Sequence, residues 1–461
     1  MFRYIICILL FFVSMGIMVY ELKSKKVDLV QCIPFLSWQA FMVLPFIMQA
    51  GKMETDAAAL QLMGIEIINL VLVLHLVLMR RHQRKSRRSD SLWIKKVNAV
   101  LGSGYFYMAI FLLIALYHII SLRGNIPLFE KFRSDPMAAA QMREEAGKLL
   151  NVPFFMKYFF RWATNLIAPL AIIAFFNCKH YIMAAVQAVL AVFYAMITTA
   201  KSNLLFFVMV LAIYFLAEYY RKITKKMWVG AAVLLMLLLI RPVSFFIGSP
   251  YSGFHYKVDK WADEPMAHRM QFIEYPEGYP VDYQKYNYVL RRMVLTPAAV
   301  SHEWYSYIAS GEEFFGYSDL LPSSKSREAE TVVAASPANI VGLWAYSEKW
   351  PEKIGQTISA NASPDADAYA RGGWLGVVIS AVILLAILQA LDILRNREHY
   401  VSEGLYTAAM GVLALALPSA SVHAILIAQG LLPVLLGMGV LYFMDIQPMN
   451  EDESLNGETS C

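Results

Sequence analysis

Residues Gly373–Leu394 read GWLGVVISAVILLAILQALDIL. This run is predominantly apolar and is long enough to cross the hydrocarbon core of a bilayer as one helix. Over the whole chain 58% of residues are hydrophobic, only 16% are charged, and the mean hydropathy is +0.48. A soluble protein of 461 residues does not have this composition. The sequence therefore predicts an all-α integral membrane protein.

Similar apolar runs on both sides of this one predict about 11 transmembrane helices. They lie at Phe2–Tyr20, Val30–Ala50, Ala58–Met79, Leu101–Leu122, Phe154–Phe176, Tyr181–Thr198, Leu204–Tyr220, Met227–Ile247, Gly373–Leu394, Glu403–Leu417 and Ala424–Phe443. The expected organisation is eight spans in 1–247 with a polar segment at 123–153, one large loop at 248–373, three spans in 374–446, and an acidic tail at 447–461.

The orientation follows from the basic segment Arg80–Arg88, which reads RRHQRKSRR between two spans. Short loops rich in arginine and lysine stay in the cytoplasm, and beside a membrane helix this role is favoured over nucleic-acid binding. The acidic tail then lies in the cytoplasm, whereas the N-terminus and the 248–373 loop lie outside.

The outer face of this topology carries an excess of basic side chains, although orientation alone would place them inside. They are Arg133, Arg143, Lys201, Arg241, Arg291, Arg292 and Arg371. Because guanidinium groups bind phosphate oxygens in pairs, the excess favours an anionic ligand at the membrane surface. The alternative is ordinary loop packing, in which these cations pair with the carboxylates of Glu144, Glu274, Glu303 or Asp365.

Acid–base chemistry is expected from His302 and Glu303. The stretch Val289–Ile308 predicts a short helix along the membrane interface, bent at Pro297, that also carries Tyr305. An imidazole or a carboxylate there can take a proton from a hydroxyl at neutral pH. Adjacent residues do not share a helix face, so only one of the two is expected to act.

Asp365 and Asp367 have the Asp-x-Asp spacing of metal-binding sugar transferases, but two aspartates in such a loop are more typical of solvated turns. The sequence has no Gly-rich phosphate loop and no His-Glu-x-x-His pattern. The positions of the four cysteines indicate neither a disulfide framework nor a metal site. The sequence therefore predicts neither a metal nor another cofactor.

Glu66 and His75 are the evident ionisable residues inside a span. Buried charges in a membrane are functional candidates, although a structural hydrogen bond between helices is favoured here because no relay partner lies nearby in sequence.

Several short motifs resemble the Wzy-type O-antigen, or oligosaccharide repeat unit, polymerases. Those motifs are GNIPL at 124–128 followed by Arg133 and Arg143, TAKSN at 199–203, LLPSS at 320–324, and AYARGGWLG at 368–376. The resemblance covers about residues 101–378 and implies a GT-C-like polymerase or ligase architecture.

The resemblance implies a glycosyltransferase on the periplasmic face of the bacterial inner membrane. It would transfer a growing glycan from undecaprenyl diphosphate to the terminal hydroxyl of a second lipid-linked repeat unit, without a metal. His302 or Glu303 is expected as the base. Substrate binding is expected from Arg133, Arg143, Lys201, Arg241, Arg291, Arg292, Arg371 and Tyr305. Expected partners are the donor and acceptor glycolipids, membrane lipid and a chain-length regulator protein, with no nucleic acid.

Three other functions remain open. An O-antigen ligase would use lipid A core as the acceptor, and a lipid-linked oligosaccharide flippase would move its substrate without chemistry. A purely structural assembly scaffold is the third. A flippase needs charged groups along a path through the membrane, and Glu66 and His75 alone are too few for one.

Overall fold

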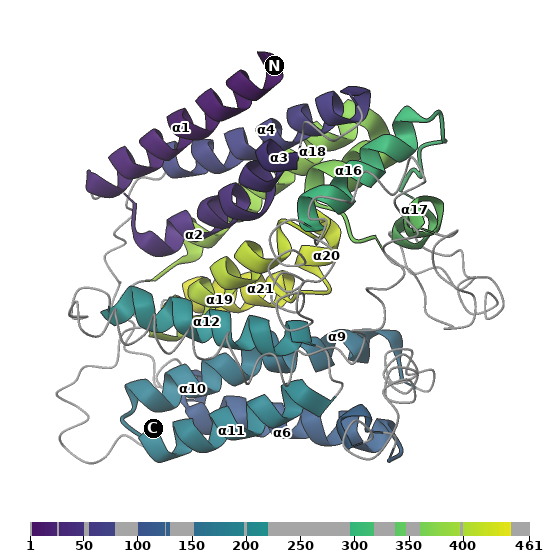
Figure 1. Ribbon diagram of the computed structural model, residues 1–461. Coiled ribbons are helices and arrows are strands. Elements are labelled where there is room, and N and C mark those ends of the chain that lie inside the picture. The colour runs from purple at the N-terminus through teal and green to yellow at the C-terminus, as the bar shows by residue number, and fades with distance from the viewer. Residues whose placement is uncertain are drawn as a thin grey trace, which may run out of the picture.

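The computed structural model is a bundle of helices, and the residues that it describes contain no strand (Figure 1). It describes residues 2–24, 27–49, 55–78, 100–124, 126–129, 152–197, 201–219, 296–317, 337–346, 360–396 and 400–443. The helices are α1 Phe2–Lys23, α2 Leu29–Trp38, α3 Leu44–Gln49, α4 Thr55–Leu78, α6 Gly104–Ser121, α9 Phe154–Trp162, α10 Ala168–Asn177, α11 Tyr181–Ile197, α12 Lys201–Tyr219, α16 Thr296–Ala309, α17 Pro337–Tyr346, α18 Pro364–Leu394, α19 Tyr400–Ala416, α20 Val422–Leu426 and α21 Leu431–Phe443. Two π-helical segments, η1 Gln39–Val43 and η3 Ala163–Ile167, join α2 to α3 and α9 to α10.

The prediction of an all-helical membrane protein is confirmed. Six helical segments are long and apolar enough to cross a bilayer, and four shorter apolar helices accompany them in the described part of the chain. The eighth expected span, Met227–Ile247, lies outside the described residues. The total of about 11 spans and the side on which each loop lies stay predictions.

Two boundaries differ from those expected. Lys201 was placed in a turn, but α12 begins at this residue. The expected last span, Ala424–Phe443, is divided into α20 and α21, and Gly430 at the junction has a φ of +91°. Glycine adopts this left-handed conformation without the steric cost that other residues bear, so the chain can interrupt the helix there.

Helix α18 shows why an apolar sequence can face both protein and lipid. Leu375, Val378, Val382 and neighbours at helical spacing are exposed, whereas Val377, Ala381, Leu384, Leu388 and Leu391 are buried. The two sets follow the 3.6-residue period on opposite faces of one helix. The buried face packs against α4, and we expect the exposed face to contact lipid.

The N-terminal end of α18 is set off by a break at Gly372 and Gly373. Gly373 has φ 59° and ψ −150°, a conformation open essentially to glycine alone. The break is supported by the segment that follows α16, because the N–H groups of Phe315 and Gly316 donate to the carbonyls of Ala370 and Arg371 at 3.0 and 3.2 Å. The turns of α18 before the break are thereby joined to α16.

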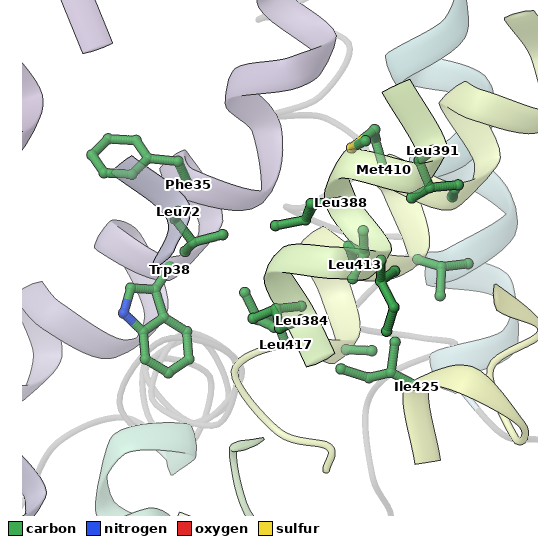
Figure 2. Packing of buried hydrophobic residues seen from close by; sticks show 14 of the residues in the cluster. Phe35, Trp38, Leu72, Leu384, Leu388, Leu391, Met410, Leu413, Leu417 and Ile425 are labelled. Atoms are coloured by element: carbon green, nitrogen blue, oxygen red, sulfur yellow. The ribbon is translucent and has the colours of Figure 1, made fainter. Parts of the chain in front are cut away.

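One large hydrophobic cluster holds α2, α4, α18 and α19 together. Figure 2 shows Phe35, Trp38 and Leu72 from the N-terminal helices opposite Leu388 of α18 and Leu413 of α19. A second cluster lies among α6, α9, α10, α11 and α12. The first cluster fixes the relative positions of α4 and α18, the two helices on which α16 packs.

Candidate functional site

Helix α16 packs between α4 and α18 and is buried on all sides over 301–307. It was expected to begin near Val289, to lie along the interface and to bend at Pro297. Residues 289–295 lie outside the described residues, and the described helix runs from Thr296 to Ala309 with Pro297 as its second residue. His302 and Glu303 are each 1% exposed. Both side chains are therefore enclosed by the protein, and the expectation that only one of the two acts stays a prediction.

His302 is oriented by Gln61 of α4. The Nε2 of Gln61 donates to the carbonyl of Ala298 at 2.7 Å, which leaves its Oε1 to accept from Nδ1 of His302 at 3.1 Å. A neutral histidine with its proton on Nδ1 has its lone pair on Nε2. Gln61 thus selects the tautomer in which Nε2 can accept a proton.

A second contact lies one helical turn along α4. The hydroxyl of Tyr305 donates to Oδ2 of Asp365 at 2.9 Å, and both residues are fully buried. A Cβ at Gly64 would lie 1.9 Å from that hydroxyl, so only glycine leaves room for the pair against α4. Burial, and then the carboxylate of Asp365, raises the pKa of Tyr305 well above its ordinary value. Tyr305 therefore remains a hydrogen-bond donor at neutral pH.

Further contacts join α16 to the chain just before α18. The hydroxyls of Ser301 and Ser363 lie 2.9 Å apart, and the indole N–H of Trp304 donates to the carbonyl of Ala360 at 2.9 Å. Gln61 and Gly64 are three residues apart on α4 and therefore share one face of that helix. On this face Gln61 contacts His302, and Gly64 lies against Tyr305. We call Gln61, Ser301, His302, Glu303, Tyr305 and Asp365 the buried polar site.

Asp365 and Asp367 are not solvated turn residues. Both lie in the first turn of α18, where the helix dipole favours negative charge. Asp367 pairs with Arg371, four residues later, at 2.9 Å, and Nη1 of Arg371 donates to the carbonyl of Gly316 at 3.1 Å. For Arg371 this arrangement favours the packing interpretation over ligand binding, because the guanidinium holds the broken helix to the segment after α16.

The remaining basic candidates cannot be placed in this site. Arg133, Arg143, Arg241, Arg291 and Arg292 lie outside the described residues, and Lys201 is described only as the first residue of α12. Gln61 is a residue that the sequence motifs do not single out, although a glutamine inside an apolar span is a detectable signal. Serine and glycine are common residue types, so only the packing of α16 identifies Ser301, Ser363 and Gly64 as part of this region.

The buried charges are more numerous than Glu66 and His75. Glu303, Asp365 and Asp392 are also largely buried within the protein. Glu66 accepts from Asn69 at 3.0 Å and lies 3.9 Å from the sulfur of Cys7, which supports its structural interpretation. His75 faces Asp392 at 3.5 Å, a partner 317 positions away that sequence proximity could not reveal.

Comparisons of the chain with protein-family models, curated proteins and solved structures find no match.

Proposed function

We propose that the protein is a membrane glycosyltransferase that joins lipid-linked oligosaccharide repeat units carried on a polyprenyl diphosphate. The observation that carries the proposal is the orientation of His302, in which Gln61 directs a proton-accepting Nε2 within a buried polar site. The short motifs that resemble Wzy-type polymerases support the same reaction.

In the proposed step, Nε2 of His302 takes the proton of the acceptor hydroxyl. The hydroxyl oxygen forms a bond to the anomeric carbon of the donor glycan, and the bond from that carbon to the diphosphate breaks. The diphosphate leaves with the electron pair, and the imidazolium later returns its proton to solvent. Cationic side chains would stabilise the leaving group, and Arg133, Arg143 and Arg291 are the candidates.

We propose that this transfer needs no metal. The carboxylate of Asp365 accepts from Tyr305, and that of Asp367 pairs with Arg371. A metal ion bound to both aspartates would have to displace these partners. A base that works on a hydroxyl and a leaving group stabilised by fixed cations are sufficient for the chemistry.

Access to the base requires a local movement. His302 is 1% exposed, so an acceptor hydroxyl reaches Nε2 only if α16 shifts relative to α4 or α18. The segment after α16 is held to α18 by the hydrogen bonds from Phe315 and Gly316. At the adjacent break, Gly372 and Gly373 do not have helical backbone angles. We propose that this break permits the shift.

The test supplies purified protein in lipid with a chemically defined undecaprenyl diphosphate repeat unit, without nucleotide and with a chelator. A ladder of glycan products is expected. His302→Ala should lower the rate by about 10²–10⁴-fold, the usual contribution of a general base. His180→Ala, at a half-buried histidine outside the site, is the matched control.

Each other outcome has a defined meaning. An unchanged rate in His302→Ala with a loss in Glu303→Gln moves the base to Glu303. A ladder that the chelator abolishes contradicts the metal-free mechanism, and a verified substrate that gives no product contradicts polymerisation. Transfer only to lipid A core would identify the ligase.

The transporter remains the second candidate because of the larger set of buried charges. Glu303, Asp365 and Asp392 add to Glu66 and His75 within the bundle. A flippase predicts that the lipid-linked substrate crosses a vesicle membrane without any change in its glycan length. Glycan extension without transbilayer movement would exclude this alternative.

A further inference from the structure

A second polar cluster lies where α4 and α18 end and where α2 and α19 begin. Asp392 of α18 is central, because its Oδ1 accepts from Gln31 of α2 at 3.0 Å and from Tyr406 of α19 at 2.6 Å. His75 of α4 lies on its other side, with Nε2 at 3.5 Å from Oδ2. Four separate segments of the chain thus converge on one carboxylate.

His75 and Asp392 face each other across an incomplete contact. His75 is 1% exposed, and neither of its ring nitrogens has a hydrogen-bond partner among the described residues. Oδ2 of Asp392 likewise has none there. A separation of 3.5 Å is too long for a good hydrogen bond. Polar atoms buried in this way are costly unless they bind something, and a functional role is the default expectation for them inside a membrane protein.

A permanent cation, Arg395, also acts on Asp392. Arg395, just after α18, is within 2.7 Å of Asp28 and also pairs with Glu403, so its guanidinium already faces two carboxylates. Burial acts to lower the pKa of Arg395, but Glu403, Tyr406 and Asp28 raise it by more, and the residue remains charged. The guanidinium that acts on Asp392 is therefore also engaged by Asp28 and Glu403.

We propose that His75 and Asp392 form a proton-binding site that holds one shared proton between α4 and α18. With that proton the pair carries no net charge, whether the proton sits on the imidazole or on the carboxyl group. Without it the pair carries a negative charge in a medium that solvates charge poorly. The proton belongs to the pair rather than to either residue, because the two groups are coupled.

The groups around the pair have opposing effects on proton binding. The carboxylate of Asp28 favours the proton. Arg395 opposes it, and Gln31 and Tyr406 donate to the ionised carboxylate. Burial of the pair favours proton uptake, because a medium that solvates charge poorly favours the neutral form of the pair.

The position of the site gives the proton a structural consequence. The buried polar site lies toward the opposite ends of the same two helices. Gln61 and Gly64 are on α4, and Asp365 is on α18. Binding of the proton would strengthen the contact between these two helices. The inference does not depend on the proposed reaction, because it concerns only the occupancy of the pair.

The test counts the protons that the protein releases between about pH 5 and pH 8, the range in which histidine-linked sites titrate. Wild type, Asp392→Asn, His75→Gln and the double variant are compared in lipid nanodiscs with a pH-indicator dye. If one proton is shared, each single variant and the double variant release one proton fewer than wild type. His180→Gln, at a half-buried histidine outside the pair, is the matched control variant.

Two outcomes would overturn the proposal. A double variant that loses two protons means that the residues titrate independently, and no loss in any variant means that the pair holds no proton. If a variant does not fold, infrared spectroscopy of wild type across the same pH range should show one carboxyl or imidazolium band that titrates. The titration is repeated with choline in place of sodium, and a dependence on sodium would identify a metal-cation site instead.

Discussion

Gly64 is the position at which the packing of the buried polar site can be tested most directly. Gly64→Ala would place a Cβ 1.9 Å from the Tyr305 hydroxyl and 2.8 Å from Oδ2 of Asp365. Tyr305 cannot rotate away easily, because it is fully buried and its ring lies 5.1 Å from that of Tyr369. The new methyl group must therefore displace α16 or break the Tyr305–Asp365 hydrogen bond.

The expected cost follows from these contacts. Overpacking of a filled core costs about 1–3 kcal/mol. Loss of a hydrogen bond to a carboxylate costs a further ~1.5–3 kcal/mol. The higher helix propensity of alanine returns about 1 kcal/mol. Where both costs apply, Gly64→Ala should lower the free energy of unfolding by about 1.5–5 kcal/mol.

The assay is reversible unfolding in mixed micelles with increasing dodecyl sulfate, followed by tryptophan fluorescence. Gly16→Ala and Gly439→Ala are matched controls, because a Cβ at either position would have no neighbour within 4 Å. Tyr305→Phe removes the hydroxyl that the methyl group meets. The combined Gly64→Ala and Tyr305→Phe variant should therefore be more stable than the sum of the two single effects predicts.

Two results would refute this reasoning. Gly64→Ala could be as stable as the two control variants, which would mean that α4 and α16 are not in close contact. The effects of Gly64→Ala and Tyr305→Phe could also be additive, which would place the clash elsewhere.

Two further predictions concern the movement and the break that the proposed function requires. Cysteines at both Ser301 and Ser363, whose hydroxyls lie 2.9 Å apart, should form a disulfide that abolishes glycan transfer until a reductant is added. Full activity of the cross-linked protein, verified by mass and compared with each single-cysteine variant, would show that this contact need not open. Gly373→Ala should destabilise the protein by about 1–3 kcal/mol, because alanine is strained at φ 59° and ψ −150°. A melting temperature equal to that of Gly439→Ala would contradict the strain argument.

The sequence by itself determined the class of the protein and most of its helices. The run at Gly373–Leu394 is predominantly apolar, and hydrocarbon favours a helix because it leaves no backbone group unsatisfied. Composition and periodicity indicate an apolar environment, whether the neighbour is lipid or protein. The six long apolar helices among the described residues were therefore predicted, with errors at their ends. His302, Glu303, Tyr305 and Asp365 were also found, because polar residues near such spans are conspicuous.

The tertiary structure alone decided how those residues meet. Gln61 and His302 are 241 positions apart, and His75 and Asp392 are 317 apart, so no local pattern could join them. Asp365 reads as a turn residue in sequence, but it is buried because α16 covers the start of α18. Burial of a polar side chain depends on which helices pack against it. That packing follows from the shapes of many side chains together, whereas periodicity reports only the pattern along one helix.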